Sequence, residues 1–210
     1  MSGKRLLGFV FLFDVVAVLI LYPHLDRFAM GYLALSTVLA VLQVIVNGRF
    51  VASEEIHRFF YAKDIDKAFD KWTAPLGLAE FAVFFEYARW RPVPELLSPS
   101  AQMAGLLLCF AGTCWLFWVD SYLMNEFPAH YRNGAILTAG PYRYFRHPRY
   151  LGLLATRFAL PLLFGSVIAY VLAISWLILV RRRAHLEENY LTTRFGALYR
   201  QYARHTIGIP

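Results

Sequence analysis

Charged residues are scarce in this chain. Only 17% of its 210 residues are Asp, Glu, Lys or Arg, whereas roughly 25% is usual for soluble domains. Apolar residues make up 59% and are gathered in long runs. A helix needs about 20 mostly apolar residues to cross roughly 30 Å of hydrocarbon. The composition therefore disfavours an ordinary soluble domain and favours an integral membrane protein.

Cysteine is almost absent as well. Cys109 and Cys114 lie in one apolar run, without a neighbouring cluster of His, Asp or Glu at metal-ligand spacing. We interpret both as small apolar residues and expect no metal. The sequence also lacks a G-x-G-x-x-G or P-loop pattern after a predicted strand, and we predict no strand at all. Any nucleotide-like cofactor must therefore bind to a site that is not of the Rossmann type.

The formal net charge of +7 comes from basic residues at the ends of the apolar runs. This placement is typical of the cytoplasmic face of a membrane, so we expect a membrane partner and no nucleic acid. The first residues, Met1–Arg5, are basic and precede an apolar run, as in a signal peptide. No small-residue cleavage pattern follows, and we expect this run to be a retained first span.

Four apolar runs predict spans at about 6–22, 29–46, 73–87 and 103–124. Between the second and third, residues 47–72 mix charges with aromatic side chains, which predicts a helix lying in the membrane interface; a solvated loop is the alternative. A fifth run, 151–180, is interrupted by Pro161 and Gly165. As one straight helix it would be about 45 Å long, too long for an untilted span.

Basic residues are distributed unevenly between the two sides that these spans define. With the N-terminus inside, eleven Lys and Arg fall in inner segments and three in outer ones, before the strongly basic 181–210 tail is included. The positive-inside rule places that tail inside too, so 151–180 must enter the membrane and return. We therefore predict an all-α, multi-pass transmembrane bundle that contains a C-terminal helical hairpin. We divide it into N-terminal helices at 1–125 and a C-terminal module at 126–210, with a cofactor pocket at the cytoplasmic face.

Two segments at the predicted inner face carry the polar chemistry. Residues 140–152 read G-P-Y-R-Y-F-R-H-P-R-Y-L-G, in which the Gly-Pro and His-Pro pairs interrupt regular helix. The irregular backbone leaves polar groups for a ligand, and Arg146 and His147 add donors. The second segment, 183–202, contains Arg183 and Glu187 four residues apart on one helical face, with Glu188 turned by roughly 100°.

These two motifs, in this order and spacing, resemble the isoprenylcysteine carboxyl methyltransferases and their phospholipid methyltransferase relatives. The resemblance covers about residues 130–210 and includes the R-H-P-R-Y-L-G stretch and R-A-H-L-E-E-N-Y-L-T-T-R-F-G. A similar R-H-P-x-Y-x-G stretch occurs in membrane sterol reductases, so the first motif alone is less specific. The first 125 residues match no motif of the family.

The resemblance implies S-adenosyl-L-methionine as cofactor, held between the R-H-P segment and the glutamate-bearing helix. It implies Arg183 as the residue that meets a substrate carboxylate. The family's protein-modifying members have a histidine where this chain has Gly134, which puts a protein substrate in doubt. The positions that the resemblance assigns to the cofactor are Ala135, Ile136, Leu137, Tyr142, His147, Pro148, Arg149, Tyr150 and Glu187.

The acceptor implied is a lipid or a lipidated molecule in the membrane. O-methylation of a carboxylate, such as that of a prenylated cysteine, is our leading hypothesis because of Arg183. A carboxylate needs no base, whereas a lipid amine must lose a proton, and His147 or Glu188 would then be the catalytic base. A sterol-type NADPH reductase and a non-catalytic membrane protein are the remaining alternatives.

Several charged residues lie within or near the apolar runs, where an unpaired charge is costly. We expect these residues to form pairs rather than to take part in catalysis. Arg157 is the predicted partner of one of the two deepest acids, Asp14 or Glu80. The other acids of this kind are Glu86 and Asp120.

Overall fold

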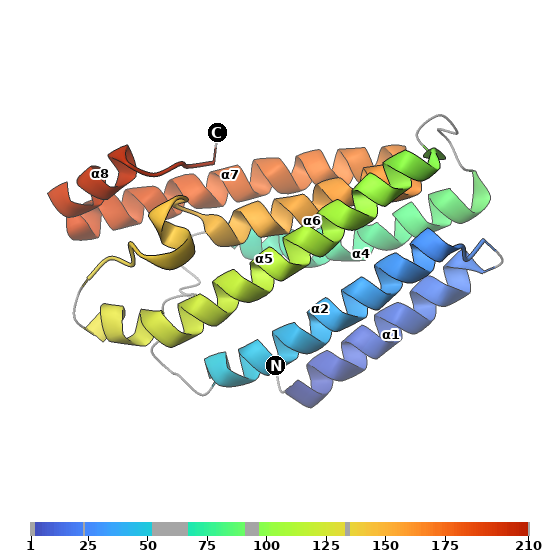
Figure 1. The fold of residues 1–210 in the computed structure, drawn as a ribbon, viewed down its shortest axis with the longest axis horizontal. Coiled ribbons are helices and arrows are strands. Elements are labelled where there is room, and N and C mark those ends of the chain that lie inside the picture. Colours follow the sequence, from blue (N-terminus) through green and yellow to red (C-terminus); the bar gives the residue numbers. More distant parts are fainter. Residues whose placement is uncertain (1–2, 23, 52–66, 91–96, 133–134, 210) are drawn as a thin grey trace.

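The computed structural model describes the chain apart from residues 1–2, 23, 52–66, 91–96, 133–134 and 210 (Figure 1). Within the described residues there is no strand, only one isolated backbone bridge between Phe145 and Ile207. The all-helical expectation is thus confirmed for this part of the chain. The helices are α1 (Gly3–Leu21), α2 (Arg27–Val51), α4 (Lys67–Arg89), α5 (Pro99–Arg132), η2 (Gly140–Arg143), α6 (Pro148–Phe164), α7 (Val167–Phe195) and α8 (Ala197–Arg204).

Three of the predicted spans lie inside longer helices, α2, α4 and α5, and the first, 6–22, ends one residue beyond α1. The turn after α1 ends where Asp26 caps α2, because its Oδ1 atom accepts the N–H groups of Phe28 and Ala29 at 3.0 and 2.9 Å. Residues 47–51 continue α2 and residues 67–72 begin α4, so neither end of the predicted interfacial segment is a separate element. The middle of that segment, 52–66, lies outside the described residues.

The apolar run at 151–180 is a helical hairpin, as predicted. Pro161 is accommodated inside α6, and the turn comes at Gly165, whose φ of 54° is the left-handed conformation that glycine adopts without strain. Ser166 then caps α7 by accepting the N–H of Ala169 at 2.9 Å. The Ser166 hydroxyl in turn donates to the buried Glu86 carboxylate of α4.

The helices run back and forth along one axis, so the polar segments that the sequence assigned to the inner face gather at one end (Figure 1). That end holds the end of α2, the start of α4, the end of α5, η2, the start of α6, the end of α7, and α8. Helix α5 packs along α6. The approach is close at Gly152, where an added Cβ would lie 2.8 Å from Leu116 Cγ. The proposed boundary at 125/126 falls inside α5 and stays a prediction.

Charged residues within the apolar runs meet polar groups of neighbouring helices. Arg157 Nη1 of α6 lies 2.8 Å from Glu80 Oε1 of α4, which confirms one of the two pairings that the sequence allowed. Asp14 instead accepts a hydrogen bond from the Thr37 hydroxyl at 2.7 Å. Both acids thus meet polar groups of neighbouring helices. Between the helices lies a core of interlocking aromatic rings, formed by Tyr32, Phe84, Tyr87 and Phe164.

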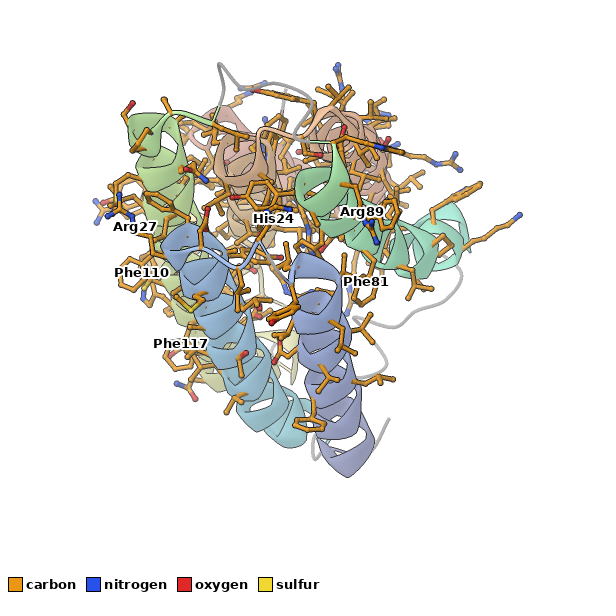
Figure 2. The ribbon with its side chains drawn as sticks, turned by 90° about the vertical axis from the view of Figure 1, so that its right-hand side faces the viewer. His24, Arg27, Phe81, Arg89, Phe110 and Phe117 are labelled. Atoms are coloured by element: carbon orange, nitrogen blue, oxygen red, sulfur yellow. The ribbon has the colours of Figure 1, made fainter. Side chains whose placement is uncertain are left out.

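Large apolar side chains also cover the outside of the bundle. Phe110 and Phe117 point away from α5 on its outer flank (Figure 2) and are 53% and 40% exposed. Contiguous exposed apolar surface marks a protein or membrane interaction site. By length and composition, one described helix could cross a membrane, α5 over Pro99–Glu126, while the apolar stretch in α1, Phe11–Leu21, is shorter.

Candidate active site

The start of α6 brings His147 against the two glutamates of α7. His147 is the residue before α6, and Pro148 follows at the first helical position, where the missing N–H is not needed. The His147 Nε2 atom lies 3.0 Å from Glu188 Oε1, and the His147 Nδ1 atom lies 3.5 Å from Glu187 Oε2. Because the two ring nitrogens point in different directions, one imidazole contacts both carboxylates, although these project about 100° apart from the helix.

Three further residues hold these glutamates. Glu187 Oε1 accepts from Arg183 Nε at 2.8 Å and from the Tyr150 hydroxyl at 2.5 Å. Glu188 Oε1 accepts from Arg146 Nη1 at 2.9 Å. The Tyr150 ring stacks on the imidazole of His147, with centroids 5.7 Å apart. We call this set the glutamate cluster: Arg146, His147, Tyr150, Arg183, Glu187 and Glu188.

The cluster sets the protonation states of its members. Burial lowers the pKa of His147, but hydrogen bonds and charge from Glu187 and Glu188 outweigh burial and raise it. The pKa of Glu187 is lowered, because hydrogen bonds from His147 and Tyr150 outweigh the opposing effect of burial. The hydrogen bond from His147 likewise lowers the pKa of Glu188. These shifts all favour the ion pair of a protonated His147 with ionised Glu187 and Glu188.

The Arg183 guanidinium is bonded within the protein, whereas the resemblance assigned it to a substrate carboxylate. Arg183 is buried, its Nε is bonded to Glu187, and its guanidinium lies over the ring of Phe69 from α4, 5.6 Å from the ring centroid. The Phe69 ring is also 6.3 Å from that of Tyr150. Phe69 therefore covers one side of the cluster, although it belongs to the part of the sequence without a family motif.

Arg149 forms an ion pair with α5 rather than with the glutamates of α7. Its Nε donates to Asp120 Oδ1 of α5 at 2.9 Å, and the Asp120 side chain is buried. Trp115 of α5 makes a second contact with the start of α6, since its indole N–H donates to the Pro148 carbonyl at 2.7 Å. Both contacts tie the start of α6 to α5. The structure thus gives Arg149 and Pro148 contacts with α5, apart from the glutamate cluster.

The remaining sequence-predicted residues lie before the cluster in the chain. Ala135, Ile136 and Leu137 lie in a connector without regular secondary structure that leads to η2; Leu137 is buried and Ala135 is exposed. Tyr142 lies in η2, and its carbonyl accepts the Tyr202 hydroxyl of α8 at 2.7 Å. Burial raises the pKa of Tyr142, so its phenol stays protonated. Gly134 lies outside the described residues.

A hollow opens on the outer side of Glu188. Its lining comes from α7 and from the segment after α8: Arg181, Ala184, His185, Glu188 and Ile209. Sequence reasoning singled out only Glu188 among these.

In the part of the chain that the structure describes, no group of three or more His, Cys, Asp or Glu side chains is arranged to hold a metal ion.

Comparison with known proteins agrees with the motifs. The family model for phospholipid methyltransferases matches residues 100–197. Methanethiol S-methyltransferase 2 of Bradyrhizobium diazoefficiens is 27% identical over 165 aligned positions, which cover 65% of this chain and 62% of that protein. Methanethiol S-methyltransferase 1 of the same organism is 22% identical, covering 96% of this chain and 82% of that protein.

The chain thus spans about three fifths of the length of the first of these relatives. No solved structure matches the chain. The matched residues, 100–197, include nearly all of α5 and the whole of η2, α6 and α7, and therefore the whole glutamate cluster. Residues 100–197 are thus similar to a phospholipid methyltransferase domain, in agreement with the resemblance of the two motifs.

Proposed function

We propose that this chain transfers a methyl group from S-adenosylmethionine to a nucleophile that arrives from the membrane. The observation that carries the proposal is the glutamate cluster, in which two carboxylates meet an imidazolium and two guanidinium groups. The cofactor carries an ammonium, a sulfonium and a carboxylate, so acidic and basic groups of this kind fit it. The buried Nε atom of Arg146, which has no partner within the described residues, leaves a donor for such a ligand.

Each residue of the cluster has a role in this proposal. Glu187 and Glu188 hold cationic groups of the cofactor, while Arg146 and His147 hold its carboxylate. When bound, S-adenosylmethionine supplies a methyl group activated by the sulfonium. The protein orients the partners and excludes water, and the Tyr150 and Phe69 rings limit access from the side of α4. Ala135, Ile136, Leu137, Tyr142, Pro148 and Arg149 stay in the proposed cofactor set on the resemblance alone.

Proton requirements separate the possible acceptors. An ammonium with a pKa of about 10 must lose a proton before it attacks, and needs a base. His147 and Glu188, the two candidate bases, are bonded to each other, and Glu188 is also bonded to Arg146. A thiol, with a pKa of about 8.5, is a few per cent ionised at neutral pH and is intrinsically very nucleophilic. The cluster therefore favours a thiol or a carboxylate over a lipid amine.

Between a thiol and a carboxylate, we propose a thiol. Arg183, the residue expected to bind a carboxylate, is bonded to Glu187 and covered by Phe69. The two curated relatives named above are methanethiol S-methyltransferases by name, and methanethiol is a small apolar thiol. O-methylation of a carboxylate, as on a prenylated cysteine, is the second candidate because a buried arginine does lie in the cluster.

We also propose that the bundle crosses the membrane several times, with the cluster at the cytoplasmic face. The exposed apolar side chains of α1, α5 and α7 form the surface that lipid would cover; among them are Phe11, Leu107, Phe110, Val171 and Ile178. Arg27 and Arg89 lie at the opposite end of the bundle from the cluster (Figure 2). An apolar acceptor dissolved in the bilayer can then approach the cluster from the side.

Calorimetric titration of detergent-solubilised protein with S-adenosylmethionine and, separately, NADPH tests the cofactor. We expect binding of the first only, and binding of NADPH alone would support a reductase. Transfer of a labelled methyl group to an alkanethiol, a prenylated cysteine and a lipid amine then tests the acceptor. With a thiol the rate should rise about tenfold per pH unit below the thiol pKa, because only the thiolate attacks. A pH-independent rate on the carboxylate, without transfer to the thiol, would favour the second candidate.

A further inference from the structure

The segment after α8, residues 206–209, folds back onto the start of the domain's first motif (Figure 1). Ile207 N donates to the Tyr144 carbonyl at 2.9 Å, and Arg146 N donates to the Ile207 carbonyl at 2.9 Å. The Thr206 hydroxyl donates to the Tyr202 carbonyl of α8 at 2.9 Å, which holds the beginning of the segment. The 206–209 segment is thus fastened directly beside Arg146.

Gly208 packs closely against the guanidinium of Arg146. A Cβ added to Gly208 would be 2.4 Å from Arg146 Nη2, 2.7 Å from Cζ and 3.1 Å from Nε. Carbon and nitrogen atoms that are not bonded need more than 3 Å, so no larger residue fits while the guanidinium stays where it is. The backbone at Gly208 therefore limits where the guanidinium can lie.

The other side of this guanidinium faces the glutamate cluster. Arg146 Nη1 donates to Glu188 Oε1, the same oxygen that contacts His147 Nε2. Ile209, the next residue of the segment, lines the hollow beside Glu188 and packs against the apolar cluster around Trp176. Arg146 is thus enclosed between the 206–209 segment and Glu188. Gly208 on one side and Glu188 on the other restrict the positions open to this guanidinium, which favours one arrangement of Glu188 and His147.

We propose that Gly208 is a positioning residue of the cofactor site, which acts by holding Arg146 against Glu188. The inference rests on the proposed function, because the cluster is taken as the site that receives the charged amino-acid part of S-adenosylmethionine. It adds a segment that follows the matched residues, 100–197, to the machinery of the site. It also gives Gly208 a role that neither its position in sequence nor a helical pattern indicates.

A double-mutant cycle on the full chain tests the proposal. Gly208→Ala, Arg146→Ala and the double variant are titrated with S-adenosylmethionine and with its demethylated product. Losing a charge-assisted contact costs on the order of 1.5–3 kcal/mol, so we expect Gly208→Ala alone to weaken binding about tenfold or more. In the Arg146→Ala background the same change should alter binding less than about twofold. Gly77→Ala is the control, since an added Cβ there has nothing within 4 Å.

The outcomes separate the inference from the proposed function. If the unaltered protein binds neither ligand, the proposed function fails and the inference with it. If the unaltered protein binds but Gly208→Ala has no effect, or has the same effect in the Arg146→Ala background, the inference is overturned and the proposed function stands. Should Gly208→Ala lower thermal stability, adding Arg146→Lys should restore it, because the slimmer ammonium can move aside; no recovery would also overturn the inference.

Discussion

Arg183 and Glu187 lie one helical turn apart on α7, and the Arg183 Nε atom donates to Glu187 Oε1 at 2.8 Å. The face of the same guanidinium is covered by Phe69. One of the Arg183 donors, Nε, is therefore already bonded to a glutamate of the proposed cofactor site. This relationship changes what a substitution at Arg183 should do, because the residue acts through Glu187 rather than on the acceptor.

We expect Arg183→Lys to weaken S-adenosylmethionine binding severalfold and to leave turnover at saturating cofactor nearly unchanged. Lysine keeps the charge but loses the planar group that bonds Glu187 while it lies on an aromatic ring. Binding is measured by calorimetry and turnover by labelled-methyl transfer, with the exposed Arg181→Lys as the matched control. Unchanged binding together with a large loss of turnover would instead identify Arg183 as the group that holds a substrate carboxylate.

Glu187→Gln should cost more cofactor affinity than Glu188→Gln. Glu187 has three partners in the cluster, His147, Tyr150 and Arg183, whereas Glu188 has two, Arg146 and His147. Loss of its charge-assisted contacts should cost on the order of 1.5–3 kcal/mol, about ten- to a hundredfold in affinity. The adjacent Glu188→Gln variant serves as the comparison in the same titration. Equal and small effects at both positions would mean that the pair is only part of a surface ion-pair lattice.

The folded protein should lose stability as the pH rises above about 6.5. An unfolded histidine titrates near that value, whereas the pKa of folded His147 is raised, so between the two values the folded state binds the proton that the unfolded state has released. The contribution of His147 is therefore complete below about pH 6.5 and is lost as the pH rises through its folded pKa. The lowered pKa values of Glu187 and Glu188 act in the opposite direction, since their contribution is lost only as the pH falls below about 4.3.

Thermal unfolding of wild-type protein and of His147→Gln, followed in detergent between pH 5 and 9, measures this effect. The wild-type protein should be most stable between roughly pH 4.5 and 6.5. The variant should be less stable in that range, and its stability should change little above it. A decline of equal slope in both proteins would show that another group is responsible.

Arg157→Ala should destabilise the bundle strongly. It leaves Glu80, which is 4% exposed, as a buried carboxylate without the guanidinium at 2.8 Å. Breaking a buried ion pair on one side costs about 3–5 kcal/mol, whereas replacing both partners with apolar residues is often neutral. We therefore expect Arg157→Leu with Glu80→Leu to unfold at a higher temperature than Arg157→Ala. The reverse order would mean that Arg157 contributes mainly by its packing on Trp176.

Single cysteines should be labelled from opposite sides of the membrane at the start of α5 and in α8. The start of α5 and α8 lie at opposite ends of the bundle (Figure 1), and each offers an exposed position, Ser100 and Arg204. Ser100→Cys and Arg204→Cys are compared in a background where Cys109 and Cys114 are replaced by alanine. A membrane-impermeant maleimide applied to intact cells should reach only the first. Labelling of both from the same side would contradict the proposed topology.

The sequence by itself determined the helices and the hairpin. Apolar runs bounded by polar or Gly-Pro residues define helices because backbone groups surrounded by apolar side chains must bond to one another. Arg183 and Glu187 could be assigned to one face because four residues make about one helical turn. The charge of Arg157 likewise required an acid nearby, and the sequence left only the choice between Asp14 and Glu80 open.

Tertiary structure decided which groups meet across the bundle. Glu188 projects away from Glu187, yet both reach His147, because the start of α6 lies between them with two ring nitrogens available. Arg149 is in the same motif but turns to Asp120 of α5. Phe69 and Gly208 reach the cluster from segments far away in the sequence. Periodicity fixes directions only within one helix, whereas contacts between helices depend on how the side chains of both pack, and this is why sequence reasoning missed them.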